Sequence, residues 1–376
     1  MNIRTLGQRL YQGKISYDFV GKRKTWYTIS AVILVITIGS LAFRGLNLGI
    51  EFRGGAEFSI PPSACSVEDA RDTAESSVGG QAIVTQTGDG SIRIQTGDVS
   101  PAKSTEVTQA LGQACDVKPS DISVRIVGPT WGADISQKAL QGLIVFLVLV
   151  TIFLAIYFEF KMAIGALVAL AHDLVITIGV FSLLGFEVTP ATAIGVLTIL
   201  GYSLYDTVVV FDKVRENTQG ILGQSRLTYS EAANLAVNQT IMRSINTSIV
   251  ALLPVGAILF VGAGLLGAGT LKDLALALFV GMAAGTYSSI FVATPLLAQL
   301  KNREPEVQAL ERRVYARRRK AEDESGLAEA VAGSTGGQGA AVLLDSRNVN
   351  ETGSRNQPKK QTRSKRKGGD SGQKQP

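Results

Sequence analysis

The apolar residues of this chain are gathered into long blocks instead of being spread evenly along it. Six blocks run for about 20 residues, the length of helix that crosses the ~30 Å hydrocarbon core of a bilayer. Only helices and closed barrels satisfy their backbone groups in lipid, and unbroken apolar blocks favour helices. The pattern therefore predicts a polytopic α-helical membrane protein. The predicted transmembrane helices cover residues 26–46, 138–158, 162–185, 189–212, 241–263 and 271–299.

A polar segment of residues 47–136 separates the first two blocks. From residue 50 to 128 its pattern predicts a strand, a helix, two strands, a helix and a last strand. The two middle strands meet at Asp89-Gly90, a pair that supplies the positive dihedral angles of a tight hairpin turn. The order βαββαβ predicts a ferredoxin-like α+β domain between the first two transmembrane helices.

Lysine and arginine flank the blocks mainly on one side, and this asymmetry predicts the orientation in the membrane. The basic loop of residues 213–240 and the basic tail of residues 301–376 are expected in the cytoplasm, together with residues 1–25. Six Lys and Arg against twelve Asp and Glu suit residues 47–136 to the outer face. We therefore predict an extracytoplasmic domain and two cytoplasmic termini.

The two cysteines, Cys65 and Cys115, both fall in the external segment. An oxidising compartment would allow them to form a disulfide, and a bridge across a loop of this length stabilises a domain by about 2–4 kcal/mol. The alternative is two unpaired thiols that are buried separately. The sequence leaves both open.

The tail changes character after residue 301. A basic stretch, "ERRVYARRRK", predicts a helix, and the Gly-, Ala-, Ser- and Gln-rich sequence behind it predicts disorder because it has too little apolar surface to bury. We interpret its positive charge as a signal that fixes topology and also contacts anionic lipid. Specific binding to nucleic acid, such as ribosomal RNA, is the weaker alternative.

The informative ionisable residues within the apolar blocks are His172, Asp173, Asp206 and Arg243. A charge at the centre of a bilayer costs about 2.5–3.5 kcal/mol on insertion scales, so these side chains are expected to face protein or water. Arg243 enters from the same side as Asp206 and would reach its carboxylate if their helices are neighbours. One interpretation is a fixed ion pair that holds the helices together, and the other is a proton relay. The grouping of four such residues favours the relay.

Helical spacing predicts which faces of the later blocks point inward. Gly281 and Gly285 form a small-xxx-small pair that is typical of close helix packing. The predicted inward stripes are Gly195, Thr198, Tyr202 and Asp206 in the fourth block and Arg243, Asn246 and Thr247 in the fifth.

Other chemistries find little support in the sequence. No G-x-x-x-x-G-K-[ST] phosphate loop is present, which argues against ATP hydrolysis. "GAGLLG" at residues 262–267 has no strand before it, so a loop or a close helix contact is a better interpretation than nucleotide binding. Tyr205-Asp206 lacks the Gly-x-Gly-Asp partner of an intramembrane aspartyl protease, and one histidine with two external cysteines offers no convincing metal site. We expect no enzyme activity, no cofactor and no metal.

Four motifs, in order, resemble one protein family. They are "LNLGIEFRGG" behind the first apolar block, "AHDLVITIG" in the third, "GYSLYDTVVVFDKVREN" in the fourth and "NQTIMRSINTS" at the start of the fifth. Together they are similar to SecF proteins, the smaller subunits of the bacterial SecDF complex of the Sec protein translocase, which is related to the resistance-nodulation-division transporters.

The resemblance implies a SecD partner whose own transmembrane helices complete the core in the cytoplasmic membrane. It also implies that the proton motive force promotes late-stage export, with the SecYEG translocon, emerging preproteins and, indirectly, SecA as further partners. Asp206 matches the family's proton-transporting aspartate, and Arg243 matches its arginine. The other motif residues, with structural or anchoring roles expected, are Gly54, Gly55, Gly201, Tyr202, Ser203, Asp212 and Arg215.

Two alternatives stay open beside this hypothesis. One is a passive scaffold that stabilises SecD and the translocon and uses its buried charges only for packing. The other is small-molecule efflux by a related transporter, against which the single small external domain argues. The chain also carries Tyr205 and Phe211 where relatives often have Asn and Ser, so fewer polar groups are expected beside Asp206.

Overall fold

The computed structural model describes residues 16–87, 90–263 and 269–334, and every structural statement below refers to these residues. The chain divides into two compact units, Met1–Tyr315 and Ala316–Pro376, and the apolar helices and the external segment lie in the first. The basic stretch behind residue 301 is helical as predicted, within α12 (Pro305–Ser334). The disorder predicted behind it, the turn residue Asp89 and most of residues 262–267 lie outside the described residues.

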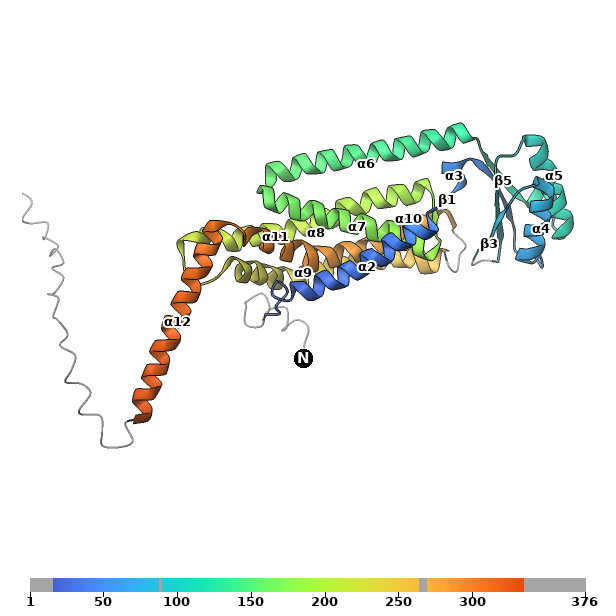
Figure 1. Ribbon diagram of the computed structural model, residues 1–376. Helices are drawn as coiled ribbons and strands as arrows, with labels where there is room; N and C mark the ends of the chain where they lie inside the picture. The colour runs from blue at the N-terminus through green and yellow to red at the C-terminus, as the bar shows by residue number, and fades with distance from the viewer. Residues whose placement is uncertain (1–15, 88–89, 264–268, 335–376) are drawn as a thin grey trace, which may run out of the picture. The chain divides into compact units, whose positions relative to one another are not determined.

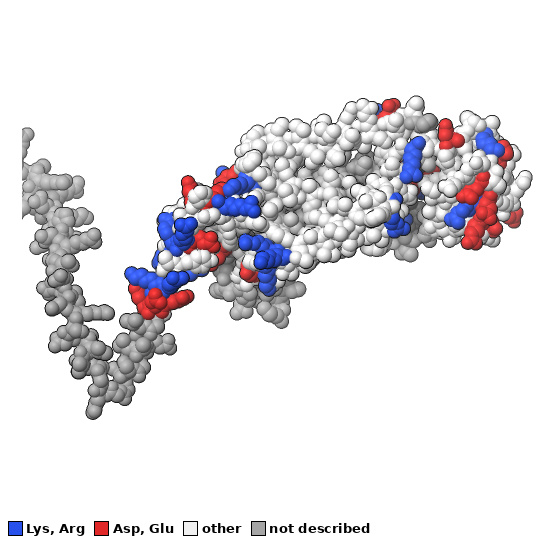
Figure 2. Space-filling view, viewed as in Figure 1, with Lys and Arg blue, Asp and Glu red and all other residues white. Residues whose placement is uncertain are grey.

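Six helices in this range are long and apolar enough to cross a membrane, which confirms the predicted architecture. In Figure 1, α7, α8, α9 and α10 run side by side with α2, and α6 lies along the outside of α7 and α8. Figure 2 shows a surface nearly free of charged side chains over these helices, as a membrane-embedded surface requires. The helices are α2 (Arg23–Arg44), α6 (Pro129–Tyr157), α7 (Phe160–Leu184), α8 (Pro190–Thr218), α9 (Tyr229–Ala257) and α10 (Gly269–Ser288).

Several helices are longer than their apolar blocks. α6 begins at Pro129 instead of residue 138, because Pro is well suited to the first position of a helix. Much of the loop predicted at residues 213–240 is also helical, since α8 continues to Thr218 and α9 already begins at Tyr229. Thr228 caps α9 in a capping box that fixes this start. Hydropathy detects only the part of a helix that is apolar, so it missed these polar ends.

The external segment folds as the predicted ferredoxin-like α+β domain. Its sheet has the strand order β3-β4-β2-β5 with antiparallel neighbours, and α4 and α5 pack together on it. The buried faces of strands and helices form a core of their own around Phe58 and Leu111. The elements are β2 (Gly55–Ile60), α4 (Val67–Val78), β3 (Ile83–Gln86), β4 (Ile92–Thr96), α5 (Pro101–Ala114) and β5 (Ser123–Val127).

The first predicted strand begins later than the sequence pattern indicates. Residues Ile50–Arg53 form one helical turn, α3, which ends at Gly54, and β2 starts only at Gly55. Gly54 and Gly55 have φ angles of 77° and 135°, a region that side chains rarely adopt, and the carbonyl of Thr96 occupies the space that a Cβ of Gly55 would need. This pair of glycines therefore turns the chain sharply from the membrane surface into the sheet.

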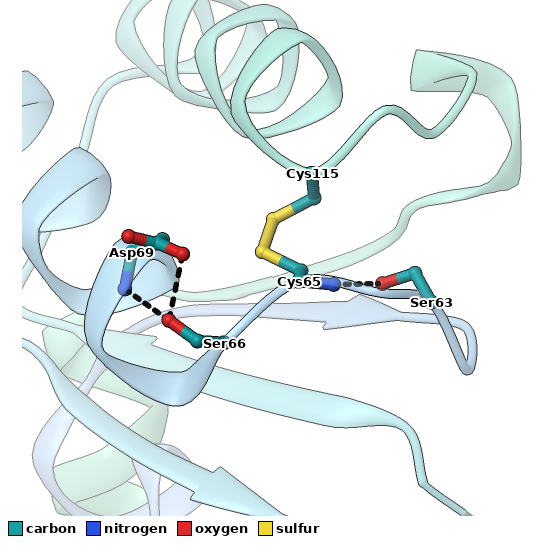
Figure 3. Close-up of a disulfide and its surroundings, with 5 residues drawn as sticks. All are labelled: Ser63, Cys65, Ser66, Asp69 and Cys115. Carbon is teal, nitrogen blue, oxygen red and sulfur yellow. Dashed lines mark hydrogen bonds between the residues drawn. A yellow bond between two sulfur atoms is a disulfide. The ribbon is translucent and has the colours of Figure 1, made fainter.

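The two cysteines form a disulfide in the structure. Figure 3 shows Cys65, between β2 and α4, bonded to Cys115, the C-cap of α5. Next to it, Ser66 caps α4 by accepting a hydrogen bond of 3.0 Å from the backbone N–H of Asp69. The bridge closes a loop with a sequence separation of 50 and ties the two helices together.

Candidate functional site

Asp173 lies fully buried near the middle of α7 and accepts hydrogen bonds from hydroxyl groups of two other helices. Its Oδ2 accepts hydrogen bonds from Ser203 of α8 at 2.5 Å and from Ser288 of α10 at 2.7 Å. Its Oδ1 lies 3.2 Å from Nδ1 of the neighbouring His172, which is also buried. Hydroxyl groups can donate to a charged carboxylate and also accept from a neutral one. This arrangement is therefore compatible with both protonation states of Asp173.

Two glycines of α10 make the approach of α8 and α10 possible, as the small-xxx-small pattern predicts. A Cβ added at Gly285 would lie 2.8 Å from Cβ of Ser203, and one added at Gly281 would overlap the side chain of Ile199. A larger side chain at either position would force the helices apart and carry Ser203 away from Asp173. The packing of α8 on α10 thus fixes the geometry of the carboxylate site.

Asp206 is the second buried carboxylate, with 6% of its surface exposed. Its Oδ1 accepts a hydrogen bond of 2.7 Å from Ser244 of α9. Its Oδ2 is buried and has no hydrogen-bond partner among the residues that the structure describes. A buried oxygen without a partner is energetically costly, so it marks a place where a proton, a water molecule or a partner group is expected.

Two consecutive serines, at the start of a π-helical segment, lie beside the two carboxylate sites. α10 continues through η4 (Ser289–Ala293) into α11 (Thr294–Lys301), and single turns of π-helix inside α-helices are frequent at functional sites. Ser288 contacts Asp173, and the next residue, Ser289, lies 3.0 Å from the hydroxyl of Thr207. Thr207 directly follows Asp206. Consecutive residues of one helix therefore contact both carboxylate sites.

The predicted contact between Arg243 and Asp206 is wrong. The guanidinium of Arg243 donates to the hydroxyl of Tyr205 at 3.1 Å, and the next residue on α9, Ser244, takes the place beside the carboxylate. One residue corresponds to about 100° around a helix, so Ser244 points inward where Arg243 points outward. Tyr205, an unexpected residue at this position, thereby gains a role as the partner of Arg243.

The predicted inward stripes are also partly wrong. Gly195 and Asp206 are buried, but Thr198 is exposed and returns its hydroxyl to the backbone of its own helix, and Tyr202 is only half-buried. On α9 the whole predicted stripe lies on the exposed surface of the chain. The buried polar residues of these two helices include Thr192, Ser203, Asp206 and Thr207 on α8 and Asn238, Thr240, Ser244 and Ser248 on α9.

His172 faces α2 and α10. Its ring stacks on Tyr287 with 6.1 Å between ring centroids, and the tyrosine hydroxyl lies 3.1 Å from the hydroxyl of Ser30 and donates to the carbonyl of Trp26 at 3.2 Å. Nε2 of His172 is buried without a partner among the described residues. The imidazole therefore extends the polar network from Asp173 toward α2.

The remaining motif residues lie away from the carboxylates. Asp212 is exposed near the end of α8, and Arg215 donates to the carbonyl of Tyr157 at 3.3 Å, which ties α8 to the end of α6. Phe211 is fully buried in an edge contact with Phe158 and takes no part in the polar network. In the described part of the chain, no three His, Cys, Asp or Glu side chains are grouped as metal ligands.

Comparison with known proteins identifies the family. A family model described as the C-terminal region of the protein export membrane protein SecD/SecF matches residues 107–303, and the SecD/SecF GG motif matches residues 39–63. The chain belongs to the SecD/SecF family. The protein translocase subunit SecF of Streptomyces coelicolor is 54% identical, over 84% of this chain and 84% of that protein. SecF of Mycobacterium tuberculosis H37Rv is 45% identical, over 82% and 73%.

A solved relative supports the SecD/SecF fold. The crystal structure of SecDF from Thermus thermophilus, a translocon-associated membrane protein, is 31% identical with a TM-score of 0.69. The match covers 77% of this chain and 39% of that one. The chain thus spans about two fifths of the SecDF polypeptide.

Three residues of the site were not expected from the sequence: Ser244, Ser288 and Ser289. Ser288-Ser289 interrupts an apolar block four residues after the small-xxx-small pair, which would place it on the same packed face. This spacing is the sequence feature that could have predicted Ser288 and Ser289. No comparable feature marks Ser244, because the charge of the adjacent Arg243 favours the opposite face of α9.

Proposed function

We propose that this chain promotes the export of preproteins across the cytoplasmic membrane together with a SecD subunit, and that it uses the proton motive force to do so. The SecYEG translocon, with SecA acting indirectly, would be its further partners, and both termini would lie in the cytoplasm. The chain would catalyse no covalent reaction. The names of its relatives support the export role, and the buried carboxylates support the use of protons.

The observation that carries the proposal is the pair of hydroxyl-coordinated carboxylates inside the transmembrane bundle. Asp173 and Asp206 are both buried, and in the described structure their closest polar partners are serine hydroxyls and an imidazole instead of Lys or Arg. A carboxylate can take up and release a proton, and the hydroxyl groups around it can donate to its charged form and accept from its neutral form. Groups balanced in this way are suited to binding and releasing protons.

The exposed polar face of α9 supports a membrane-embedded partner. Arg243, Asn246 and Thr247 all lie on the surface of this chain within a helix long enough to span a membrane, and Tyr205 of α8 extends the same face. A charged guanidinium in contact with lipid tails costs several kcal/mol. Transmembrane helices of SecD would remove that cost by covering the face. Such a partner would also approach Asp206, whose helix lies beside α9.

The test compares Asp206→Asn and Asp173→Asn with Asp212→Asn in vesicles that contain the complete complex. Asp212 lies on the same helix as Asp206 but is exposed, so its variant controls for the loss of one negative charge. We expect both buried variants to abolish the stimulation of export by a proton gradient while the complex still assembles. The Asp212 variant should behave as the wild type.

The scaffold alternative makes a different prediction for the same variants. If the carboxylates serve only packing, Asn substitution lowers the amount of assembled complex, and the complex that remains responds normally to the gradient. Normal stimulated export per assembled complex in both buried variants would refute proton use by this chain. Export measured with a sodium gradient in place of the proton gradient identifies the coupling ion.

A further inference from the structure

A polar bridge joins the external domain to the first turn of α8. The bridge is centred on Glu187, which pairs in a short parallel ladder of β6 (Glu187–Val188) with β1 (Asn47–Leu48). Two residues later, Thr189 caps α8 in a capping box with Thr192. Glu187 is therefore held rigidly to the start of the helix that carries Ser203 and Asp206.

The side chain of Glu187 extends from β6 to the sheet of the external domain. Its Oε1 accepts a hydrogen bond of 2.6 Å from Nε2 of Gln95, and its Oε2 lies 3.4 Å from the guanidinium of Arg93. Both partners belong to β4, where they alternate with the core residues Ile92 and Ile94 and so project from the face opposite the packed helices. The open face of the sheet is thus the face that contacts the bundle.

The bridge is built into the fold and is not an incidental surface contact. Glu57 of β2 lies 3.7 Å from Arg93 and 3.3 Å from Gln95, so the sheet holds both partners of Glu187 in place. The side chains of Glu187 and Glu57 are only 16% and 13% exposed. A Cβ at Gly49 would lie 2.7 Å from Oε1 of Glu187, so this glycine makes room for the carboxylate.

Open space on both sides isolates the bridge. One cavity of about 240 Å³ is lined by Arg93, Gln95 and Glu187 together with Lys272 and Asp273 at the start of α10. A second cavity of about 240 Å³ is lined by Arg93 and Glu187 together with Glu51, Glu57 and Arg125. Between these cavities, Glu187 and its two partners form a direct side-chain link from β4 to the residues that precede α8. Burial raises the pKa of Glu187, although the hydrogen bond from Gln95 and the charge of Arg93 oppose the rise.

We propose that Glu187 is the positioning residue that couples α8 to the external domain, so that a displacement of α8 moves the sheet through Gln95 and Arg93. The proposal rests on the proposed function, since it needs protonation of the carboxylates on or beside α8 to move that helix. It adds the residue through which the movement leaves the membrane. Glu187 itself handles no proton of the relay.

The test measures proton flux, export and domain movement in the same vesicles, which hold the complete complex. The variants are Glu187→Ala and, on the sheet side, Gln95→Ala, which leaves α8 unchanged. Glu106→Ala is the matched control, because Glu106 pairs with Lys103 on the exposed surface of α5. Spin labels on cysteines introduced at Lys118 and Gln219, both exposed, report the distance between the domain and the far end of α8. The native cysteines are paired and do not react.

We expect wild-type proton flux in both bridge variants but a loss of gradient-stimulated export of about tenfold, the scale of one buried hydrogen bond to a charged group. The proton gradient should no longer change the distance between the two spin labels in the Glu187 and Gln95 variants, whereas it should still change this distance in the Glu106 variant. Wild-type export and distance change in the bridge variants would overturn the coupling but leave the proposed function intact. Export lost only in proportion to the amount of folded complex would also overturn it. Absence of Asp206-dependent flux in the wild type would refute the proposed function and, with it, the coupling.

Discussion

Removing the hydroxyl donors of Asp173 one at a time should reveal whether this carboxylate is charged. Ser203→Ala and Ser288→Ala each delete one hydrogen bond to the same oxygen, at 2.5 and 2.7 Å, from two different helices. Alanine fits the space of serine and is favourable in a helix, so the change is confined to the hydroxyl group. Neither substitution alters the backbone packing that Gly285 permits.

The magnitude follows from the charge of the acceptor. A hydrogen bond to a charged group contributes about 1.5–3 kcal/mol, whereas one between neutral groups contributes about 0.5–1.5 kcal/mol. If Asp173 is ionised, the free energy of unfolding should fall by about 1.5–3 kcal/mol in each single variant. In the double variant it should fall by about 3–6 kcal/mol, because Oδ2 then has no donor in a buried site. If Asp173 is protonated, the double variant should lose at most about 3 kcal/mol.

The assay is the unfolding of the purified complex in detergent, with each variant measured at several pH values. Thr198→Ala is the control, since Thr198 lies on α8 but is exposed and bonds only to the backbone of its own helix. When both serine substitutions are repeated in an Asp173→Asn background, each should lower the free energy of unfolding by only about 0.5–1.5 kcal/mol, the range for a hydrogen bond between neutral groups. The reasoning fails if Ser203→Ala is no more destabilising than Thr198→Ala, or if its cost is unchanged when Asp173 is replaced.

Two further predictions test the packing of the bundle and the ion pairs beside the end of α11. Gly195→Ala should destabilise the fold by about 1–3 kcal/mol, because the new Cβ would lie 2.9 Å from Cβ of Ala277. Thermal unfolding measures this loss, and the double variant with Ala277→Gly should recover the lost stability. Burial would raise the pKa of Glu304, but the hydrogen bond from Lys161 and the charge of Lys301 lower it overall. A lowered carboxyl pKa stabilises the folded state above the unfolded value of about 4.3 and loses that contribution as the pH falls. Glu304→Gln should therefore cost up to about 1 kcal/mol near pH 7 and nothing below about pH 3, as measured by unfolding across that range.

The sequence predicts the helices and strands well, because they depend on long patterns, but it predicts poorly which side chain of a helix faces inward. Apolar blocks and strand order depend on patterns many residues long, so six helices and the ferredoxin-like sheet were predictable. The partner of Asp206 depends on a rotation of one residue on α9, and the sequence favours the wrong residue because the charge of Arg243 is a stronger signal than the hydroxyl of Ser244. The contacts of Ser289 depend on the π-helical segment, which no periodicity in the sequence indicates.

The two helices that supply ligands to Asp173 both run without interruption toward the external domain. α8 is uninterrupted from Pro190 to Thr218, and its rise of about 1.5 Å per residue places Ser203 roughly 20 Å from the cap at Thr189. α10 is likewise uninterrupted from Gly269 to Ser288, and it passes into π-helix only behind Ser288, on the side away from Asp273. Helix continuity therefore does not distinguish the two routes. The difference lies in the contact with the sheet, because Glu187, two residues before the cap of α8, accepts a hydrogen bond from Gln95 and pairs with Arg93 of β4. These two contacts are the reason why the substitution of Glu187 tests the coupling.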